Sequence, residues 1–299
     1  MAASADQANT KDMRNRSFLR SLTAGITTAL ISTVVTSAAH GALKTIVIDP
    51  GHGGHDTGAS QESIRESHLA LSISTRLQKK LESQGHRVLL TRDKDEWISL
   101  ESRAAFANTS GADLFISIHL NSSTDSRAHG KEFYFQNQLP VDEEALYLAN
   151  RENHSHDENE KQTPGADRIE KARLREAEIA RLPPVDIENR SVRADVKNIL
   201  EDLDRSSRVR ESSELAKALF NSWQSSSAST SLQKSRAALR GIRQAPFFLV
   251  SNVAMPSVLV EVGFLTHKTE GKKLQDESYQ NELAGSLATG IQRYFNRQP

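Results

Sequence analysis

Two histidines and two glutamates lie where they could share one site. His52 follows a β-branched run and a Pro-Gly pair, and His119 closes a second apolar run. Glu66 opens a helical pattern, and Glu261 lies inside a late apolar run. If these runs are neighbouring strands of one sheet, the four side chains can converge at the edge where α/β proteins place their sites.

Two neutral imidazoles and one carboxylate are the protein ligands of a catalytic zinc site, which keeps its fourth position for water. The ion lowers the pKa of that water and polarises a scissile carbonyl, while a second, unligated carboxylate transfers protons. The pattern therefore predicts His52, Glu66 and His119 as zinc ligands, and Glu261 as the catalytic carboxylate.

Each of these residues also has a simpler interpretation. Read alone, the stretch 46–58 could be a plain glycine turn that carries a surface histidine, and Glu66 could favour a helix N-terminus through the macrodipole. Glu261 is harder to explain away, because it lies among Val, Leu and Phe residues. Burying a carboxylate there is costly unless something pairs with it.

The hydrophobic pattern predicts the elements that would position these residues. A strand at 44–49, an amphipathic helix from Glu66 to Gly85 and a strand at 86–91 form a parallel pair with a crossover. The other expected strands are 113–119, an edge or antiparallel strand at 131–136, and strands at 246–250 and 256–263. The other expected helices of this part are 100–108, 213–223 and 278–295.

The stretch 138–210 has a different texture. Its aromatic content falls and its charge density rises, and its helical segments at 170–181 and 192–203 are accompanied by Pro164-Gly165 and Pro183-Pro184. We expect a helical insertion here, within a domain that spans 40–299.

The composition limits the partners and the metal ligands. Lys plus Arg and Asp plus Glu number 38 each, so the formal net charge of zero points to neither nucleic acid nor an anionic membrane surface. The chain has no cysteine. Any metal must therefore be held by His, Asp or Glu.

The first 39 residues have the pattern of an export signal. Arg14, Arg16 and Arg20 precede an uncharged run that ends on Ser37-Ala38-Ala39. We expect cleavage after Ala39, no membrane segment after it, and a periplasmic or secreted protein. Asn15 replaces the first arginine of a twin-arginine signal, so Sec and Tat export both remain open.

Five motifs, in order, resemble those of the zinc-dependent N-acetylmuramoyl-L-alanine amidases of the bacterial cell wall. They are Ile48-Asp49-Pro50-Gly51-His52-Gly53-Gly54, Arg65-Glu66, Thr91-Arg92, Ser117-Ile118-His119-Leu120-Asn121-Ser122 and Leu259-Val260-Glu261-Val262-Gly263-Phe264. The resemblance implies a peptidoglycan hydrolase that cleaves the amide between N-acetylmuramic acid and L-alanine of the stem peptide.

The resemblance also implies zinc ligands His52, Glu66 and His119, and catalytic Glu261. We expect an α/β fold: a single domain with a central twisted, mostly parallel or mixed sheet flanked by helices, plus the helical insertion. His55 stands where the family commonly has lysine, and we treat it as a pocket-rim residue.

The insertion has a counterpart in the cell-division amidases of this family. There an inserted helix covers the zinc, and one of its glutamates takes the open coordination position. The segment 148–153 is similar, so Glu152 is the candidate autoinhibitory ligand, with Glu143, Glu144 and Asp157 as competitors. His154 and His156 could add a ligand. The resemblance implies a periplasmic protein activator that displaces the helix, and a role in daughter-cell separation.

Two other functions fit the same residues. The ligand types alone suit a zinc carboxypeptidase or a deacetylase that acts on the cell wall. A non-catalytic cell-wall binding regulator could keep the fold, although the presence of all four site residues argues against it.

Overall fold

The computed structural model describes residues 43–61, 63–136, 143–154, 187–225 and 239–297, all within the compact unit 41–299. Side chains are not described at 154, 187–199, 225, 239 and 240. The expected export signal, the helix at 170–181, the competitor Asp157 and the possible further ligand His156 lie outside the described residues.

The centre of the fold is a six-stranded sheet with the order β4-β1-β5-β8-β6-β7. The first four strands in that order are parallel, whereas β6 is antiparallel to β8 and parallel to β7. The strands are β1 (Thr45–Pro50), β4 (Arg87–Leu90), β5 (Leu114–Asn121), β6 (Lys131–Gln136), β7 (Leu239–Ala245) and β8 (Ser257–Phe264). The mixed sheet confirms the expected α/β class.

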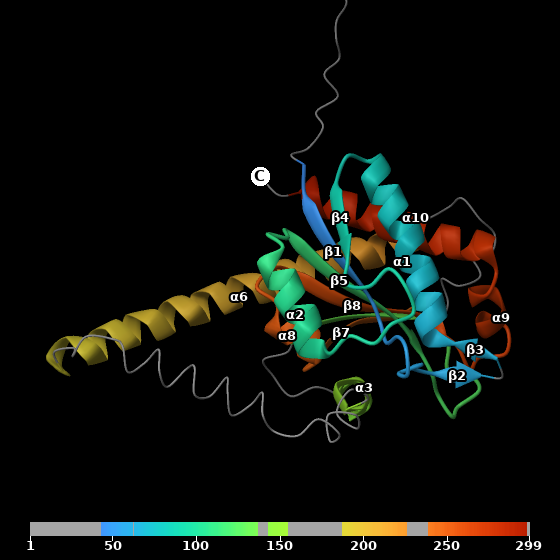
Figure 1. The fold of residues 1–299 in the computed structure, drawn as a ribbon, viewed down its shortest axis with the longest axis horizontal. Helices are drawn as coiled ribbons and strands as arrows, with labels where there is room; N and C mark the ends of the chain where they lie inside the picture. Colours follow the sequence, from blue (N-terminus) through green and yellow to red (C-terminus); the bar gives the residue numbers. More distant parts are fainter. Residues whose placement is uncertain (1–42, 62, 137–142, 155–186, 226–238, 298–299) are drawn as a thin grey trace, which may run out of the picture. The chain divides into compact units, whose positions relative to one another are not determined.

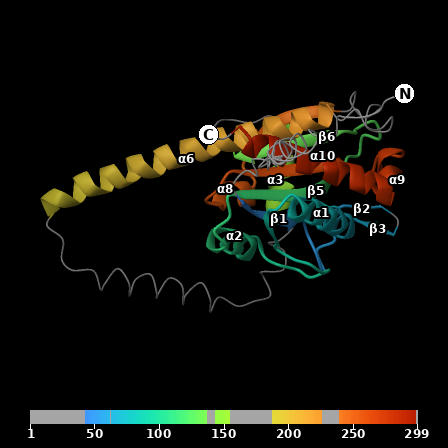
Figure 2. The same cartoon turned by 90° about the horizontal axis from the view of Figure 1, so that it is seen from above.

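Helices cover both faces of this sheet. One face packs against α1 (Glu66–Ser83), α6 (Ile187–Ser225) and α10 (Glu277–Phe295). The other packs against α2 (Leu100–Thr109), α3 (Glu143–His154) and α8 (Phe248–Asn252). Figures 1 and 2 show the sheet between these layers. The described elements also include α9 (Glu270–Leu274) and the small hairpin of β2 (Ser60–Gln61) and β3 (Ile64–Arg65).

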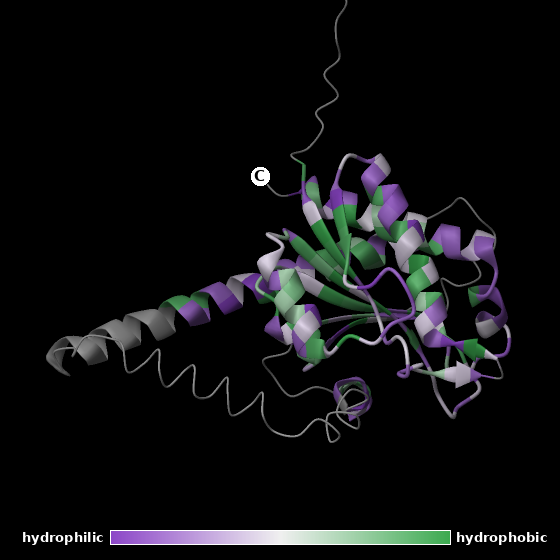
Figure 3. Cartoon of the chain, viewed as in Figure 1, coloured by the Kyte–Doolittle hydropathy of each residue, from purple (hydrophilic) through white to green (hydrophobic). Residues whose placement is uncertain are grey.

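The burial follows from the sequence pattern. In α1, Leu69, Ile73, Leu77 and Leu81 recur at helical spacing and are buried against the sheet. The helix ends before Gly85, whose φ of 92° suits glycine. All eight residues of β5 are buried, as expected for a central parallel strand. The sheet is accordingly among the most hydrophobic parts of the chain in Figure 3.

The strand expected at 131–136, at an edge or antiparallel, is β6, which is antiparallel to β8. It lies inside the sheet because the unanticipated β7 pairs with it and forms the edge. Three other expected elements differ in the structure. The strand expected at 246–250 is wrong, since residues 248–252 form α8. The helices expected at 192–203 and 213–223 are parts of one helix, α6, which continues through Arg210, the expected end of the insertion.

Candidate metal centre

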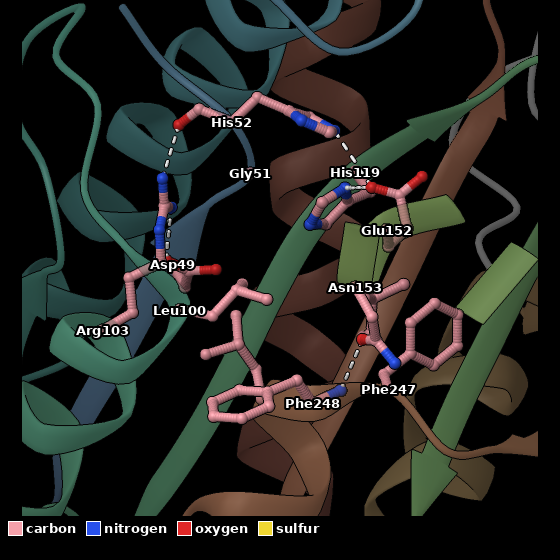
Figure 4. A pocket seen from close by; sticks show the side chains of 12 residues that line it. Asp49, Gly51, His52, Leu100, Arg103, His119, Glu152, Asn153, Phe247 and Phe248 are labelled. Carbon is pink, nitrogen blue, oxygen red and sulfur yellow. Dashed lines mark hydrogen bonds and ion pairs between the residues drawn. The ribbon is translucent and has the colours of Figure 1, made fainter. Parts of the chain in front are cut away.

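The four residues predicted to form the site come together at one edge of the sheet. His52 follows β1, His119 lies near the end of β5, and Glu66 is the first residue of α1. Glu261 on β8 is in register with His119 on the neighbouring strand. A fifth residue, Glu152 of α3, approaches from outside the sheet, and Figure 4 shows its side chain beside both histidines.

Two histidine nitrogens and two carboxylate oxygens lie close together. Nε2 of His52 lies 3.2 Å from Oε1 of Glu66 and 3.2 Å from Oε2 of Glu152. Nδ1 of His119 lies 3.2 Å and 3.4 Å from the same two oxygens. All four side chains are buried, with exposed fractions of at most 8%.

This arrangement fits a tetrahedral zinc ion. Zinc binds imidazole nitrogen and carboxylate oxygen at about 2.0–2.2 Å, so tetrahedral ligand atoms lie roughly 3.3 Å apart. The four measured separations scatter around that value. Among the described residues, Nδ1 of His119 is also buried without a hydrogen-bond partner, which is expected of an atom that ligates a metal.

The His52 side chain is held in place from its own loop. Its Nδ1 is 2.9 Å from Oδ2 of Asp56, which places the proton on Nδ1 and leaves Nε2 to bind a metal. The backbone of His52 has φ of 57°, a sparsely populated conformation for a residue with a side chain. Asp56 was not anticipated, although its position four residues after His52 was a visible signal.

Glu66 is oriented by two backbone donors. The amide of Leu120 donates to Oε1 at 2.8 Å, and the amide of Ala59 donates to Oε2 at 2.8 Å. The carboxylate is therefore fixed between β5 and the loop after β1. Burial raises its pKa, but His52 and His119 outweigh this and hold the pKa of Glu66 well below its usual range.

The glycines around His52 make room for protein groups. A Cβ on Gly51 would lie 2.5 Å from the His119 ring, and one on Gly58 would lie 2.5 Å from the His52 ring. A Cβ on Gly53 would meet the Glu96 carbonyl at 2.2 Å. These positions exclude side chains because the ligands and the next loop pack directly on the backbone.

Glu261 is fully buried, in register with His119 on the neighbouring strand. Among the described residues, neither of its carboxylate oxygens has a hydrogen-bond partner. Burial raises the pKa of Glu261 well above its ordinary value, and the charges of Glu66 and Glu152 raise it further. A bound cation would offset part of this effect. A raised carboxyl pKa next to a metal site is typical of a group that exchanges protons.

Helix α3 closes the site. Oε1 of Glu152 accepts hydrogen bonds from Nε and Nη2 of Arg151, at 3.0 and 2.9 Å, while Oε2 faces the histidines. The Asn153 side chain donates to the Pro246 carbonyl and accepts from the Phe248 amide, which anchors the helix. The remaining space beside His52, His119 and Glu152 is about 20 Å³, enough for about one water.

The other carboxylates of α3 are less suited to the site. Glu144 is half-exposed and pairs with Arg243, and Glu143 is exposed. The side chain of His154 is not described. Of the described glutamates in α3, the structure places Glu152 against the two histidines.

Comparison with known proteins identifies the family. Residues 46–293 match the N-acetylmuramoyl-L-alanine amidase family. The chain belongs to this family.

Two relatives of this amidase domain are themselves named N-acetylmuramoyl-L-alanine amidases. Over 259 residues it is 31% identical to the amidase AmiC of Neisseria meningitidis, covering 86% of this chain and 54% of the relative. The chain thus spans about half the length of that relative. It is 28% identical to Escherichia coli AmiA, covering 86% of this chain and 78% of that protein.

A solved amidase structure has the same fold as this chain. The amidase of Clostridium difficile 630 superimposes with a TM-score of 0.57 at 26% identity, covering 86% of this chain and 99% of that one. These matches confirm the family resemblance that the sequence motifs indicate.

In this amidase two buried arginines hold the loop that carries His52. Arg103 donates to the carbonyls of Pro50 and His52 at 2.8 and 2.7 Å, and Arg92 donates to those of Pro50 and Gly51 at 3.0 and 2.7 Å. The charge of Arg103 is balanced by the buried carboxylate of Asp49, 2.8 Å away. The sequence motifs contain Asp49 and Arg92 but not Arg103, and nothing in the sequence shows that the two arginines bind the carbonyls of this loop.

Asp49→Asn is expected to lower the free energy of unfolding by about 3 kcal/mol, because it leaves Arg103 buried without its counter-charge. Burial raises the pKa of Asp49, but Arg103 and hydrogen bonds from Thr91 and Ser117 overcome this and lower it to about 2. The carboxylate thus stabilises the fold above its unfolded pKa of about 4, and this contribution disappears as the pH falls towards 2.

Urea unfolding at pH 7 and pH 3 measures this effect. The difference between wild type and Asp49→Asn should shrink at pH 3. Glu277→Gln is the matched control, since its ion pair with Arg76 involves a side chain that is 84% exposed, and its effect should stay below about 1 kcal/mol. Equal effects of the two substitutions would contradict a structural role for Asp49.

Proposed function

We propose that this protein is an exported, zinc-dependent amidase that hydrolyses the bond between the lactyl group of N-acetylmuramic acid and L-alanine of the stem peptide. The observation that carries the proposal is that a nitrogen of each histidine lies 3.2–3.4 Å from the same two carboxylate oxygens, beside a separate buried carboxylate. Family membership supplies the substrate class.

His52, Glu66 and His119 would hold the zinc, which supplies an acidified water and polarisation of the scissile carbonyl. Glu261 would take a proton from the attacking water and deliver it to the alanine nitrogen as the carbon–nitrogen bond breaks. Its burial and the lack of described hydrogen-bond partners leave its carboxylate available for both transfers.

Glu152 would block this chemistry by occupying the fourth ligand position. A cavity of about 20 Å³ has no room for a sugar-peptide, so α3 must move before a substrate can bind. A partner can cause this only if it binds the open state more tightly than the closed state. We propose that a periplasmic activator does so during daughter-cell separation.

Product analysis tests the reaction. Mass spectrometry of digested peptidoglycan should show intact stem peptides separated from intact glycan strands. A carboxypeptidase would instead shorten the stem, a deacetylase would remove acetyl groups, and a non-catalytic regulator would leave the wall unchanged. Any of these three outcomes from a zinc-loaded protein with α3 displaced would overturn the proposal.

Export is supported by the signal pattern of residues 1–39. In the part of the chain that the structure describes, no helix has the length and apolar character needed to cross a bilayer.

A further inference from the structure

The two flanks of the metal centre differ in chemistry. Along the sheet edge, the strand order puts β4 and its following loop on one side of His52, and β8 and β6 on the far side of His119. A substrate that crosses the metal must lie along this edge. The inference below rests on the proposed amidase function and adds the direction in which the substrate lies.

The flank next to β4 is aromatic. His55 and Trp97 are stacked, with ring centroids 5.1 Å apart and planes inclined by 29°, and the imidazole is exposed. The Gly54 amide donates to Asp95 at 2.9 Å, and a Cβ on Gly54 would lie 2.7 Å from the Trp97 amide nitrogen. The two loops are therefore locked together, and they present a rigid, flat ring surface of the kind that packs against the C–H face of a sugar.

The flank beyond β5 holds a cavity of about 320 Å³, which we call the polar cavity after its hydrogen-bonding groups. Its lining is mixed: Tyr134, Tyr147, Leu148 and Phe264 contribute apolar surface, and amide, hydroxyl, guanidinium and carboxylate groups come from Asn121, Ser122, Ser123, Thr124, Thr266, Arg151 and Glu144. These groups donate and accept hydrogen bonds, as the backbone and carboxylates of a peptide require. Helix α3 forms part of the cavity wall. When α3 moves away, the surface formed by β5, β8 and the loops after them remains to bind the peptide.

The reaction gives the scissile bond a direction along this edge. Glu261 must reach the nitrogen that leaves with the peptide, and it lies on β8, beyond His119 and away from β4. The nitrogen therefore points towards the polar cavity, and the lactyl carbonyl points towards His52. The lactyl group puts only a few bonds between that carbonyl and the sugar ring, so the sugar must lie near the loop that carries His55.

We propose that the glycan strand binds on the stacked His55–Trp97 pair and that the stem peptide enters the polar cavity beyond β5. The pair, which we call the sugar platform, then determines how much the affinity for substrate rises as the glycan lengthens. The cavity determines how much the affinity rises as the peptide lengthens.

Substrate series test this assignment in the Glu152→Ala background. One series lengthens the glycan at constant peptide, and the other lengthens the peptide at constant glycan. His55→Ala and Trp97→Ala should raise KM for long glycans about tenfold, which corresponds to about 1.4 kcal/mol, and leave the gain from added peptide residues unchanged. Phe106→Ala, which removes a 39% exposed ring from α2, is the matched control and should change neither series.

A binding measurement gives a readout besides activity. Chitotetraose, a glycan without peptide, should change the tryptophan fluorescence, because Trp97 is partly exposed whereas Trp223 is buried at 1% exposure. The change should disappear in Trp97→Phe and need about tenfold more glycan in His55→Ala.

The outcomes separate the two proposals. The platform assignment is wrong if the His55 and Trp97 variants weaken the dependence of KM on peptide length and leave its dependence on glycan length unchanged. It is also wrong if chitotetraose leaves the tryptophan fluorescence unchanged. In both cases the amidase proposal stands. If the folded, zinc-loaded Glu152→Ala protein releases no stem peptides from any substrate, the amidase proposal fails.

Discussion

Glu152→Ala is expected to raise the basal hydrolysis of peptidoglycan about tenfold or more. The substitution removes an oxygen that faces both histidines and frees the fourth ligand position for water. Each 1.4 kcal/mol lost from the closed state shifts the open-to-closed ratio tenfold, and a charged contact of this kind contributes about that much or more. The increase should be partial, because α3 keeps its apolar contacts through Leu148 and its bonds through Asn153.

Release of dye-labelled fragments from peptidoglycan measures this, at equal zinc content for each variant. Glu143→Gln changes an exposed carboxylate of the same helix and should leave the basal rate unchanged. Leu148→Ala weakens the docking of α3 without touching the metal site and should also raise the rate. Autoinhibition by α3 is ruled out if Glu152→Ala and Leu148→Ala both fold, bind zinc and stay at or below the wild-type rate.

Glu261→Gln, in the Glu152→Ala background, should lower kcat by about 10²- to 10⁴-fold, the usual contribution of a positioned acid–base group. Zinc should remain bound, because its proposed ligands are His52, Glu66 and His119. The metal-free protein should not lose stability, since the substitution removes a buried carboxylate that has no described hydrogen-bond partner.

Zinc content by elemental analysis, kcat and thermal unfolding together test this role. Glu132→Gln is an informative comparison, because Glu132 is a buried carboxylate opposite Glu261 on β6 that pairs with Asn121 and Arg243. It should cost stability and change kcat little. A zinc-loaded Glu261→Gln protein that still turns over substrate would show that another group carries the proton.

The parallel part of the fold could be predicted because its pattern is local. Strands β1, β5 and β8 are apolar runs, and α1 and α10 repeat apolar residues at helical spacing. Strand β7 could not be recognised in the same way: Leu-Arg-Gly-Ile-Arg-Gln-Ala carries two arginines, which an edge strand tolerates. Its neighbour 246–250 is apolar enough for a strand, but tertiary packing makes it the short helix α8.

The residues of the candidate site likewise include some that the sequence could predict and some whose contacts it could not. His52, Glu66, His119 and Glu261 were visible because strand ends and a lone buried carboxylate are sequence features. The contacts of Asp56 and of the two clasping arginines depend on how loops far apart in sequence fold onto each other. Glu152 could be suggested by resemblance, but only the geometry separates it from Glu143 and Glu144.

The arginine clasp has a consequence for how such a protein would acquire its ion. Arg92 and Arg103 fix the carbonyls of residues 50–52 with protein hydrogen bonds alone. We therefore expect the fold of this loop to depend little on a bound ion, in contrast to small zinc domains that unfold when the ion is removed. If the protein is the zinc enzyme proposed above, we expect the metal-free form to stay folded and inactive, so that scarcity of zinc would stop the activity reversibly without exposing the chain to proteolysis.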